Sequence, residues 1–206
     1  MEELLTRFYQ PLRKKAQRFR HRKHNNFIFI HINKTGGSSI EKALDLSFKH
    51  ETALEKIQKI GRSQWNKKFT FTVVRNPWDK VVSHYHYRVQ TNQTNLGVEP
   101  IEFREWVKLS YRDKDPFYYD MPKMFMPQSD WISDNDGTIL VNFVCRFENL
   151  QNDFEKVCKS LKRKAELPHL KSSKRKKHYK DYYDEETIEI VRSSFSKDIK
   201  NFGYRF

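Results

Sequence analysis

FIFIHINKTGGSSIEKAL, residues 27–44, predicts a strand, a glycine-rich loop and a helix in succession. Its first six residues are mostly large apolar or β-branched, which favours a short buried strand. Gly36 and Gly37 allow backbone angles and close ligand approach that a Cβ would forbid. Ser38 or Ser39 can N-cap the helix that follows. A corner of this kind gathers unpaired N–H groups at one point and therefore predicts an anion site, most often a phosphate site.

Lys34 adds a positive charge to this corner. In a Walker A loop the lysine follows the second glycine and directly precedes Ser or Thr. Here Lys34 precedes both glycines, so the stretch is not a Walker A loop. The alternative interpretation is an ordinary strand–turn–helix corner with a solvated lysine.

A second unit of the same kind follows. FTFTVV at residues 69–74 predicts another buried strand. Asn76 is a good N-cap and Pro77 a good first residue for a helix after it. Arg75 precedes that helix and Ser83 lies about two turns into it. Both side chains are expected to face the crevice beyond the strand ends, where open α/β sheets bind ligands.

Strands and helices alternate along the rest of the chain, which favours an α/β fold with a parallel sheet covered by helices on both faces. Residues 111–127 read as irregular and residues 135–137 as a turn. Further elements are expected as helices at 52–60, from Pro100, at 150–161 and from Asp184 to Ile199, and as a third strand at 139–147. Residues 1–26 are expected to form a basic N-terminal helix or extension, and residues 27–206 a single domain.

The composition of the chain limits the classes of function that it can have. The chain has 206 residues, enough for one sizeable core, and a formal net charge of +14. Its aromatic share of 15% is too high for a disordered chain. The positive charge favours anionic partners, which include nucleotides, nucleic acid, anionic polysaccharide and membrane surfaces, and does not choose among them.

The two cysteines, Cys145 and Cys158, are predicted to be core residues rather than a disulfide, and they form no metal-type spacing. The sequence shows no run of 18 or more apolar residues and no signal-peptide core. We therefore expect a soluble, cytoplasmic protein without a transmembrane segment in this chain. A membrane anchor that had been removed would leave no trace in it.

Taken together, five segments resemble the PAPS-dependent sulfotransferases, in particular the carbohydrate-type and bacterial family 2 group. Two of them are similar to that group's two signatures, the lysine and glycine loop and the arginine–asparagine–proline turn with a serine on the next helix. The segments are HINKTGGSSI (31–40), FTVVRNPWDKVVSHY (71–85), VNFVCRFENLQNDF (141–154), HYKDYYDEETIEIV (178–191) and DIKNFGYRF (198–206). Asn33 stands where the family usually has proline.

The resemblance implies a donor, PAPS (3′-phosphoadenosine 5′-phosphosulfate), a product, PAP, and no metal. The acceptor would bear a hydroxyl, as on a carbohydrate, and the charge of the chain suits an anionic glycan. A nucleic-acid partner is not expected. Arg75 and Ser83 would hold the 3′-phosphate, and the basic loop from Ser172 to Tyr179 would close over the nucleotide. The 5′-phosphosulfate would be held by Lys34, Thr35, Gly36, Gly37, Ser38 and Ser39.

Sulfonate transfer moves negative charge onto the leaving phosphate oxygen, which Lys34 would stabilise as it develops. A general base must take the acceptor's proton. His50 is the candidate because the family usually has histidine before a Thr-Ala helix start, and histidine titrates near neutrality. A capping or surface histidine is the alternative, and Glu or Asp side chains are other candidates for the base. His31 is predicted to be a structural residue at the strand end.

Two other function classes stay open. A P-loop-type small-molecule kinase would need magnesium and ATP, but the Walker A lysine position and a clear Walker B acid are lacking. A basic nucleotide- or nucleic-acid-binding protein without transferase activity would account for the basic clusters, but the sequence has no recognised nucleic-acid-binding motif.

Overall fold

A three-stranded parallel sheet lies at the centre of the computed structural model, which describes residues 26–168 and 177–206. The strands are β1 (Phe27–Ile30), β2 (Phe69–Val74) and β3 (Phe143–Arg146), in the order β1-β2-β3. Phe27 pairs with Phe69, and Phe71 pairs with Phe143. The predicted α/β class with a parallel sheet flanked by helices is confirmed.

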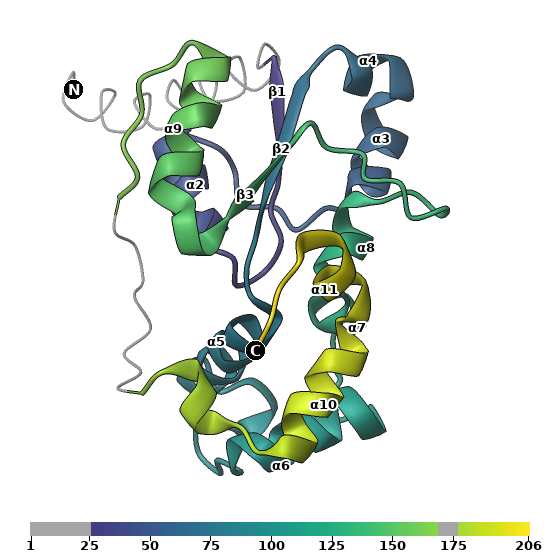
Figure 1. Cartoon of the computed structure of the whole chain (residues 1–206), viewed down its shortest axis with the longest axis vertical. Coiled ribbons are helices and arrows are strands. Elements are labelled where there is room, and N and C mark those ends of the chain that lie inside the picture. The colour runs from purple at the N-terminus through teal and green to yellow at the C-terminus, as the bar shows by residue number, and fades with distance from the viewer. Residues whose placement is uncertain (1–25, 169–176) are drawn as a thin grey trace, which may run out of the picture.

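Helices cover both faces of the sheet (Figure 1). Alternate residues of each strand point to opposite faces. The phenylalanines of β1 and β2 join a core with α2 (Gly37–Ala43) and α9 (Leu150–Leu161). The isoleucines of β1 join a second core with α3 (Ala53–Ile60), α4 (Arg62–Asn66) and α8 (Gln128–Ile132). This two-sided burial explains why each strand reads as a continuous apolar or β-branched run.

A third core lies beyond the carboxyl ends of the strands, in the lower half of Figure 1. It joins α5 (Pro77–Gln90) to α6 (Phe103–Val107), the π-helical turn η2 (Lys108–Asp113) and α10 (Glu185–Ser194). Trp78, Trp106 and Phe195 are fully or almost fully buried there. The remaining elements are η1 (Gln93–Asn95), α7 (Pro122–Phe125), η3 (Phe147–Asn149), η4 (Tyr179–Tyr182) and α11 (Ser196–Phe202).

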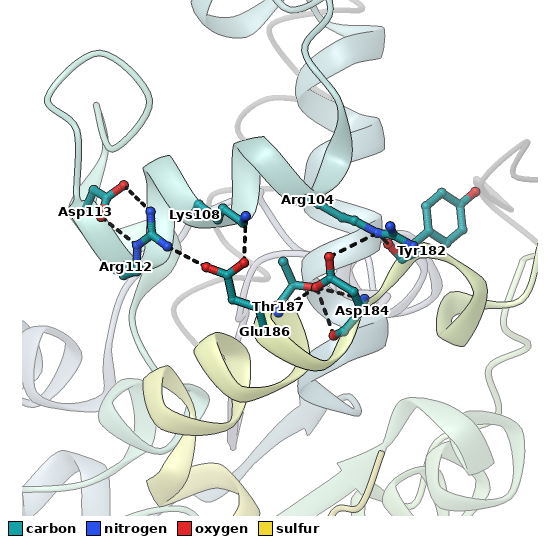
Figure 2. Close-up of polar contacts among 8 residues, drawn as sticks. All are labelled: Arg104, Lys108, Arg112, Asp113, Tyr182, Asp184, Glu186 and Thr187. Carbon is teal, nitrogen blue, oxygen red and sulfur yellow. Dashed lines mark hydrogen bonds and ion pairs between the residues drawn. The ribbon is translucent and has the colours of Figure 1, made fainter.

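The N-terminus of α10 is tied to α6 and η2 by polar contacts (Figure 2). Asp184 caps the helix by accepting a hydrogen bond from the backbone N–H of Thr187 at 2.8 Å. Glu186, in the first turn, pairs with both Lys108 and Arg112 at 2.7 Å. Glu185 and Glu186 both lie in the first turn of this helix, where negative charge is favourable to the helix dipole.

Two predicted helix starts are confirmed. Thr52 caps α3 in a capping box with Glu55. The Asn76 side chain caps α5 by accepting hydrogen bonds from the N–H groups of Trp78 and Asp79, with Pro77 as the first helical residue.

Other boundaries differ from the prediction. The expectation that Ser38 or Ser39 caps α2 is wrong, because Gly36 occupies the N-cap in the left-handed region, with φ 85°, and no side chain caps this helix. The third strand is shorter than residues 139–147, because Ile139 pairs with Ser133 instead of extending the sheet. The last helix is interrupted at Phe195, which ends α10 and precedes α11.

Both cysteines are free and buried, as predicted. Within residues 26–168 and 177–206, no helix has the length and apolar character needed to cross a bilayer. The predicted N-terminal basic helix and the predicted nucleotide contact of Ser172 lie outside the described residues.

Candidate active site

The two signature loops meet where β1 and β2 end. The Arg75 side chain donates a hydrogen bond from Nη1 to the backbone carbonyl of Lys34 at 3.1 Å. Arg75 directly follows β2 and precedes α5, whereas Lys34 lies between β1 and α2. The parallel sheet therefore brings together the two cationic residues that the sequence placed in separate strand–loop–helix units.

Contacts to both its side chain and its backbone hold Arg75 in place. Its guanidinium donates from Nε to Asp79 at 2.7 Å and lies 4.0 Å above the centroid of the Phe147 ring. Gln128 brackets its backbone, accepting from the Arg75 N–H and donating to the Arg75 carbonyl, both at 2.8 Å. The residue is only 5% exposed. Its charge is thus fixed in position before any ligand binds.

Lys34 is half-buried and has a left-handed backbone, with φ 64°. Its ammonium lies 3.9 Å from the centroid of the Tyr87 ring on α5. An ammonium over an aromatic face is stabilised electrostatically without losing its charge. The side chain of the loop lysine therefore points toward α5.

Close packing explains one glycine of the loop. A Cβ on Gly37 would lie 2.1 Å from Cδ2 of His31, so the helix approaches the strand end as closely as it does only because this residue lacks a side chain. His31 itself is buried and bonds through Nδ1 to Glu41 at 2.9 Å, in keeping with the structural role predicted for it.

The side chains of Thr35 and Asn33 fix the loop by donating hydrogen bonds to backbone carbonyls. The hydroxyl of Thr35 donates to the carbonyl of Ile32 at 2.9 Å and is fully buried, so this side chain holds the conformation of the loop. The Asn33 amide donates to the Met124 carbonyl on α7 at 2.9 Å. Asparagine in place of the family's proline therefore ties the loop to α7.

Ser83 and Tyr179, both predicted to contact the nucleotide, lie on α5 and against its first residues, respectively. Ser83 is in the second turn of α5 and is largely buried. Tyr179 interacts with the Asn76 side chain, and the pKa of its phenol is raised first by burial and then by the charges of Asp79 and Glu148. Ser38 is half-buried on the first turn of α2, and Ser39 is buried behind it.

His50 lies at the end of β1, beside the loop. Its Nδ1 lies 2.9 Å from the His31 carbonyl, and its own carbonyl accepts a hydrogen bond from Lys123 at 2.9 Å. Burial lowers the pKa of the His50 imidazole, although the hydrogen bond to the His31 backbone acts in the opposite direction. A neutral imidazole at physiological pH is the form that can accept a proton.

The two histidines of α5 have other surroundings. His84 is buried against the rings of Phe125 and Trp106, and burial together with the nearby charge of Lys80 holds its pKa well below the usual range. His86 lies 3.0 Å from the Tyr182 hydroxyl. These contacts favour a structural role for both.

A pocket of about 820 Å³ lies between η2, α10 and the connection from α7 to α8. Phe125, Met126 and Pro127 line it, and they lie between Met124, which binds Asn33, and Gln128, which binds Arg75. The rest of the lining is formed by Tyr111, Arg112, Lys114, Tyr119, Glu186, Glu189, Ile190, Ser193 and Ser194. One short segment thus contacts both loops and forms a wall of the pocket.

Several residues that organise this region were not singled out from the sequence. Asp79 pairs with Arg75 four residues earlier, a helical spacing that the sequence does display. Gln128 and Tyr87 have no such local signal, because their partners are far away in the sequence. Across the part of the chain that the structure describes, no group of three or more His, Cys, Asp or Glu residues is placed to hold a metal ion.

Comparison with known proteins agrees with this architecture. The model of the sulfotransferase family matches residues 17–205. An uncharacterized protein of Archaeoglobus fulgidus is 30% identical over 113 residues, which cover 53% of this chain and 80% of that protein. No solved structure was found to match the chain. The family match extends over most of the chain, and the chain therefore belongs to the sulfotransferase family, as its resemblance predicted.

Proposed function

We propose that this protein transfers a sulfonate group from PAPS to a hydroxyl of a carbohydrate acceptor. The observation that carries the proposal is the hydrogen bond between Arg75 and the Lys34 carbonyl at 3.1 Å, because it joins the two family signatures into one cationic site. A donor with a 5′-phosphosulfate and a 3′-phosphate needs two separate cationic contacts, and the two loops offer them. Ser38, Ser39, Ser83 and Tyr179 are the polar side chains proposed to complete the donor site.

In this proposal the acceptor oxygen attacks sulfur in line with the leaving group. The new S–O bond forms as the bond between sulfur and the 5′-phosphate oxygen breaks, and PAP leaves with the released negative charge. Lys34 stabilises that charge. His50 accepts the hydroxyl proton at Nε2, because its Nδ1 is occupied by the His31 carbonyl.

The pocket between η2, α10 and the α7–α8 connection supports a carbohydrate as the acceptor class. Sugar rings stack on aromatic side chains such as the half-buried Tyr119, and serine hydroxyls suit a polyol. Most charges at its rim are paired within the protein, since Glu186 binds Arg112 and Glu189 binds Arg192 (Figure 2 shows the first pair), whereas Lys114 lies 6.0 Å from the centroid of the Tyr119 ring. We therefore propose a mainly neutral sugar in this pocket, rather than the anionic glycan that net charge alone suggested.

Two measurements test the proposal. Calorimetric titration should show PAP binding by the intact protein that weakens strongly in Lys34→Ala. Transfer of labelled sulfonate from PAPS should appear on one or more members of a panel of neutral and acidic glycans, and should persist in EDTA. Absence of PAP binding by the intact protein would overturn the proposal, and PAP binding without transfer to any acceptor would favour a binding protein. Turnover of ATP that requires magnesium would favour the kinase alternative.

A further inference from the structure

Lys80 is a buried cation whose position the proposed reaction does not yet explain. It lies in the first turns of α5 and is 0% exposed. Its Nζ has no hydrogen-bond partner among the described residues and lies 5.3 Å from the centroid of the Phe195 ring. Burying an ammonium without a hydrogen-bond partner costs stability, and nearly all buried polar groups in proteins have partners. A lysine in such a place calls for a physical reason.

The place of Lys80 on α5 gives that reason. Lys80, Ser83 and Tyr87 follow one another at helical spacings of three and four residues, so they share one face of the helix. Tyr87 on that face contacts the Lys34 ammonium, at 3.9 Å from the ring centroid. Arg75 immediately precedes the helix, and the charges of Arg75 and Lys34 both act on Lys80. Lys80 therefore lies beneath the region where the Lys34 loop and the Arg75 loop meet α5.

The groups around Lys80 do not neutralise it by direct contact. Asp198 on α11 is the carboxylate that favours its charged form, but the Asp198 oxygens accept hydrogen bonds from the N–H groups of Gln128 and Ser129 at 2.8 and 2.7 Å. His84, one turn along α5, is held neutral by burial. Burial lowers the pKa of Lys80 to about 8, so the residue still carries its charge at neutral pH.

We infer that Lys80 is a positioning residue for the anionic donor, whose buried charge strengthens the binding of the nucleotide phosphates from beneath the two loops without touching them. The inference rests on the proposed function. A unit charge below the binding surface is expected to change the affinity for PAP by about tenfold. Bound anions favour the protonated form of a nearby lysine, so the binding of PAP should draw a proton onto Lys80 when the pH lies near its pKa.

Calorimetry of PAP binding at pH 8, in two buffers with different enthalpies of ionisation, measures this proton directly. The wild-type protein should take up a fraction of a proton, roughly one half, for each PAP bound. Lys80→Met should take up none and should bind PAP about tenfold more weakly. Lys159→Met removes one charge from an exposed position on α9 and should behave as the wild type does.

The outcomes separate the inference from the proposed function. A wild-type protein that binds PAP without proton uptake, or a Lys80→Met variant that binds PAP as the wild type does, would overturn the inference and leave the donor assignment standing. A wild-type protein that does not bind PAP at all would overturn both. The wild-type measurement needs no substitution, so an absence of proton uptake would overturn the inference even where Lys80→Met fails to fold.

Discussion

His50 and His31 are joined by a hydrogen bond of 2.9 Å between the His50 imidazole and the His31 backbone carbonyl. A carbonyl oxygen can only accept, so Nδ1 of His50 carries the proton and the lone pair of the neutral ring lies on Nε2. The strand end therefore sets which nitrogen of His50 is basic. The same strand end leads directly into the loop that holds Lys34.

Replacing His50 should lower the rate of transfer without changing the affinity for PAP. In His50→Gln the transfer rate should fall by about 10²–10⁴-fold, the usual contribution of a general base, while the affinity for PAP stays unchanged. Steady-state kinetics and PAP titration give the two quantities. His86→Gln is the matched control, because His86 contacts Tyr182 instead of the loop, and it should retain the wild-type rate. Equal rates for His50→Gln and the wild type would assign the base elsewhere.

The pH dependence of transfer should carry the signature of His50. Its pKa is lowered from 6.5, chiefly by burial, so the imidazole becomes the neutral base below pH 6.5. The rate should therefore rise with pH on an acidic limb whose midpoint lies below 6.5, and should be level from there to pH 7.5. A midpoint above 7 in a profile of kcat against pH would contradict this assignment.

Gly37→Ala should damage the fold through one contact. The new Cβ would lie 2.1 Å from His31 Cδ2, and overpacking of this kind costs about 1–3 kcal/mol in unfolding free energy. Urea denaturation measures the loss. The double variant His31→Ala/Gly37→Ala should be less unstable than the sum of the two single variants, because the clash disappears with the ring. Strict additivity would show that the clash is not the cause.

The ion pair of Arg75 and Asp79 should behave as a buried pair does. Their side chains are 6% and 11% exposed, and Asp79→Ala leaves the guanidinium buried without this carboxylate. The expected loss is about 3–5 kcal/mol in the free energy of unfolding. Arg75→Met/Asp79→Leu should recover much of that stability but should not restore PAP binding. Recovery of both would remove Arg75 from the proposed donor site.

Because of Lys80, the free energy of unfolding should increase as the pH rises above 8. Its pKa falls from 10.5 in the unfolded chain to about 8 in the folded protein, so between these values only the unfolded chain holds the proton. Its contribution to the free energy of unfolding therefore rises as the pH rises from 8 to 10.5. Below pH 8, Lys80→Met should be more stable than the wild type by on the order of 3 kcal/mol, and the difference should shrink toward pH 10.5. Chemical denaturation at pH 7 and pH 10 measures both values, and a less stable Lys80→Met at pH 7 would contradict the expectation.

Much of the fold could be predicted because its signals are local. Asn76 and Pro77 mark the start of α5, a helix was predicted at 52–60 where α3 lies, and the apolar run at 27–32 predicted β1, which ends at Ile30. The N-cap of α2 was missed because two serines outweighed Gly36, whose left-handed backbone is shown only by the folded chain. The shortened third strand likewise depends on Ser133, which takes Ile139 as its partner.

The site was predictable where it follows from motifs and was not where it follows from packing. Lys34 and Arg75 were named from their loops, and the parallel sheet brings those loops together. No pattern near Lys80 indicates that its ammonium is buried, because that burial depends on Phe195, more than a hundred residues later. The pocket likewise combines η2, the α7–α8 connection and α10, which are distant in sequence.

The all-parallel order β1-β2-β3 also bears on how the chain folds. Phe27 must find Phe69, and Phe71 must find Phe143, across intervening helices, so no pair of these strands can form first as a local hairpin. Closing such long loops costs conformational entropy before the strands gain stability from pairing. This slows folding relative to helical bundles. Until β1 and β3 arrive, both edges of β2 and its FTFTVV sequence are open to other chains. Refolding at high protein concentration should therefore lose material to aggregation at this central strand.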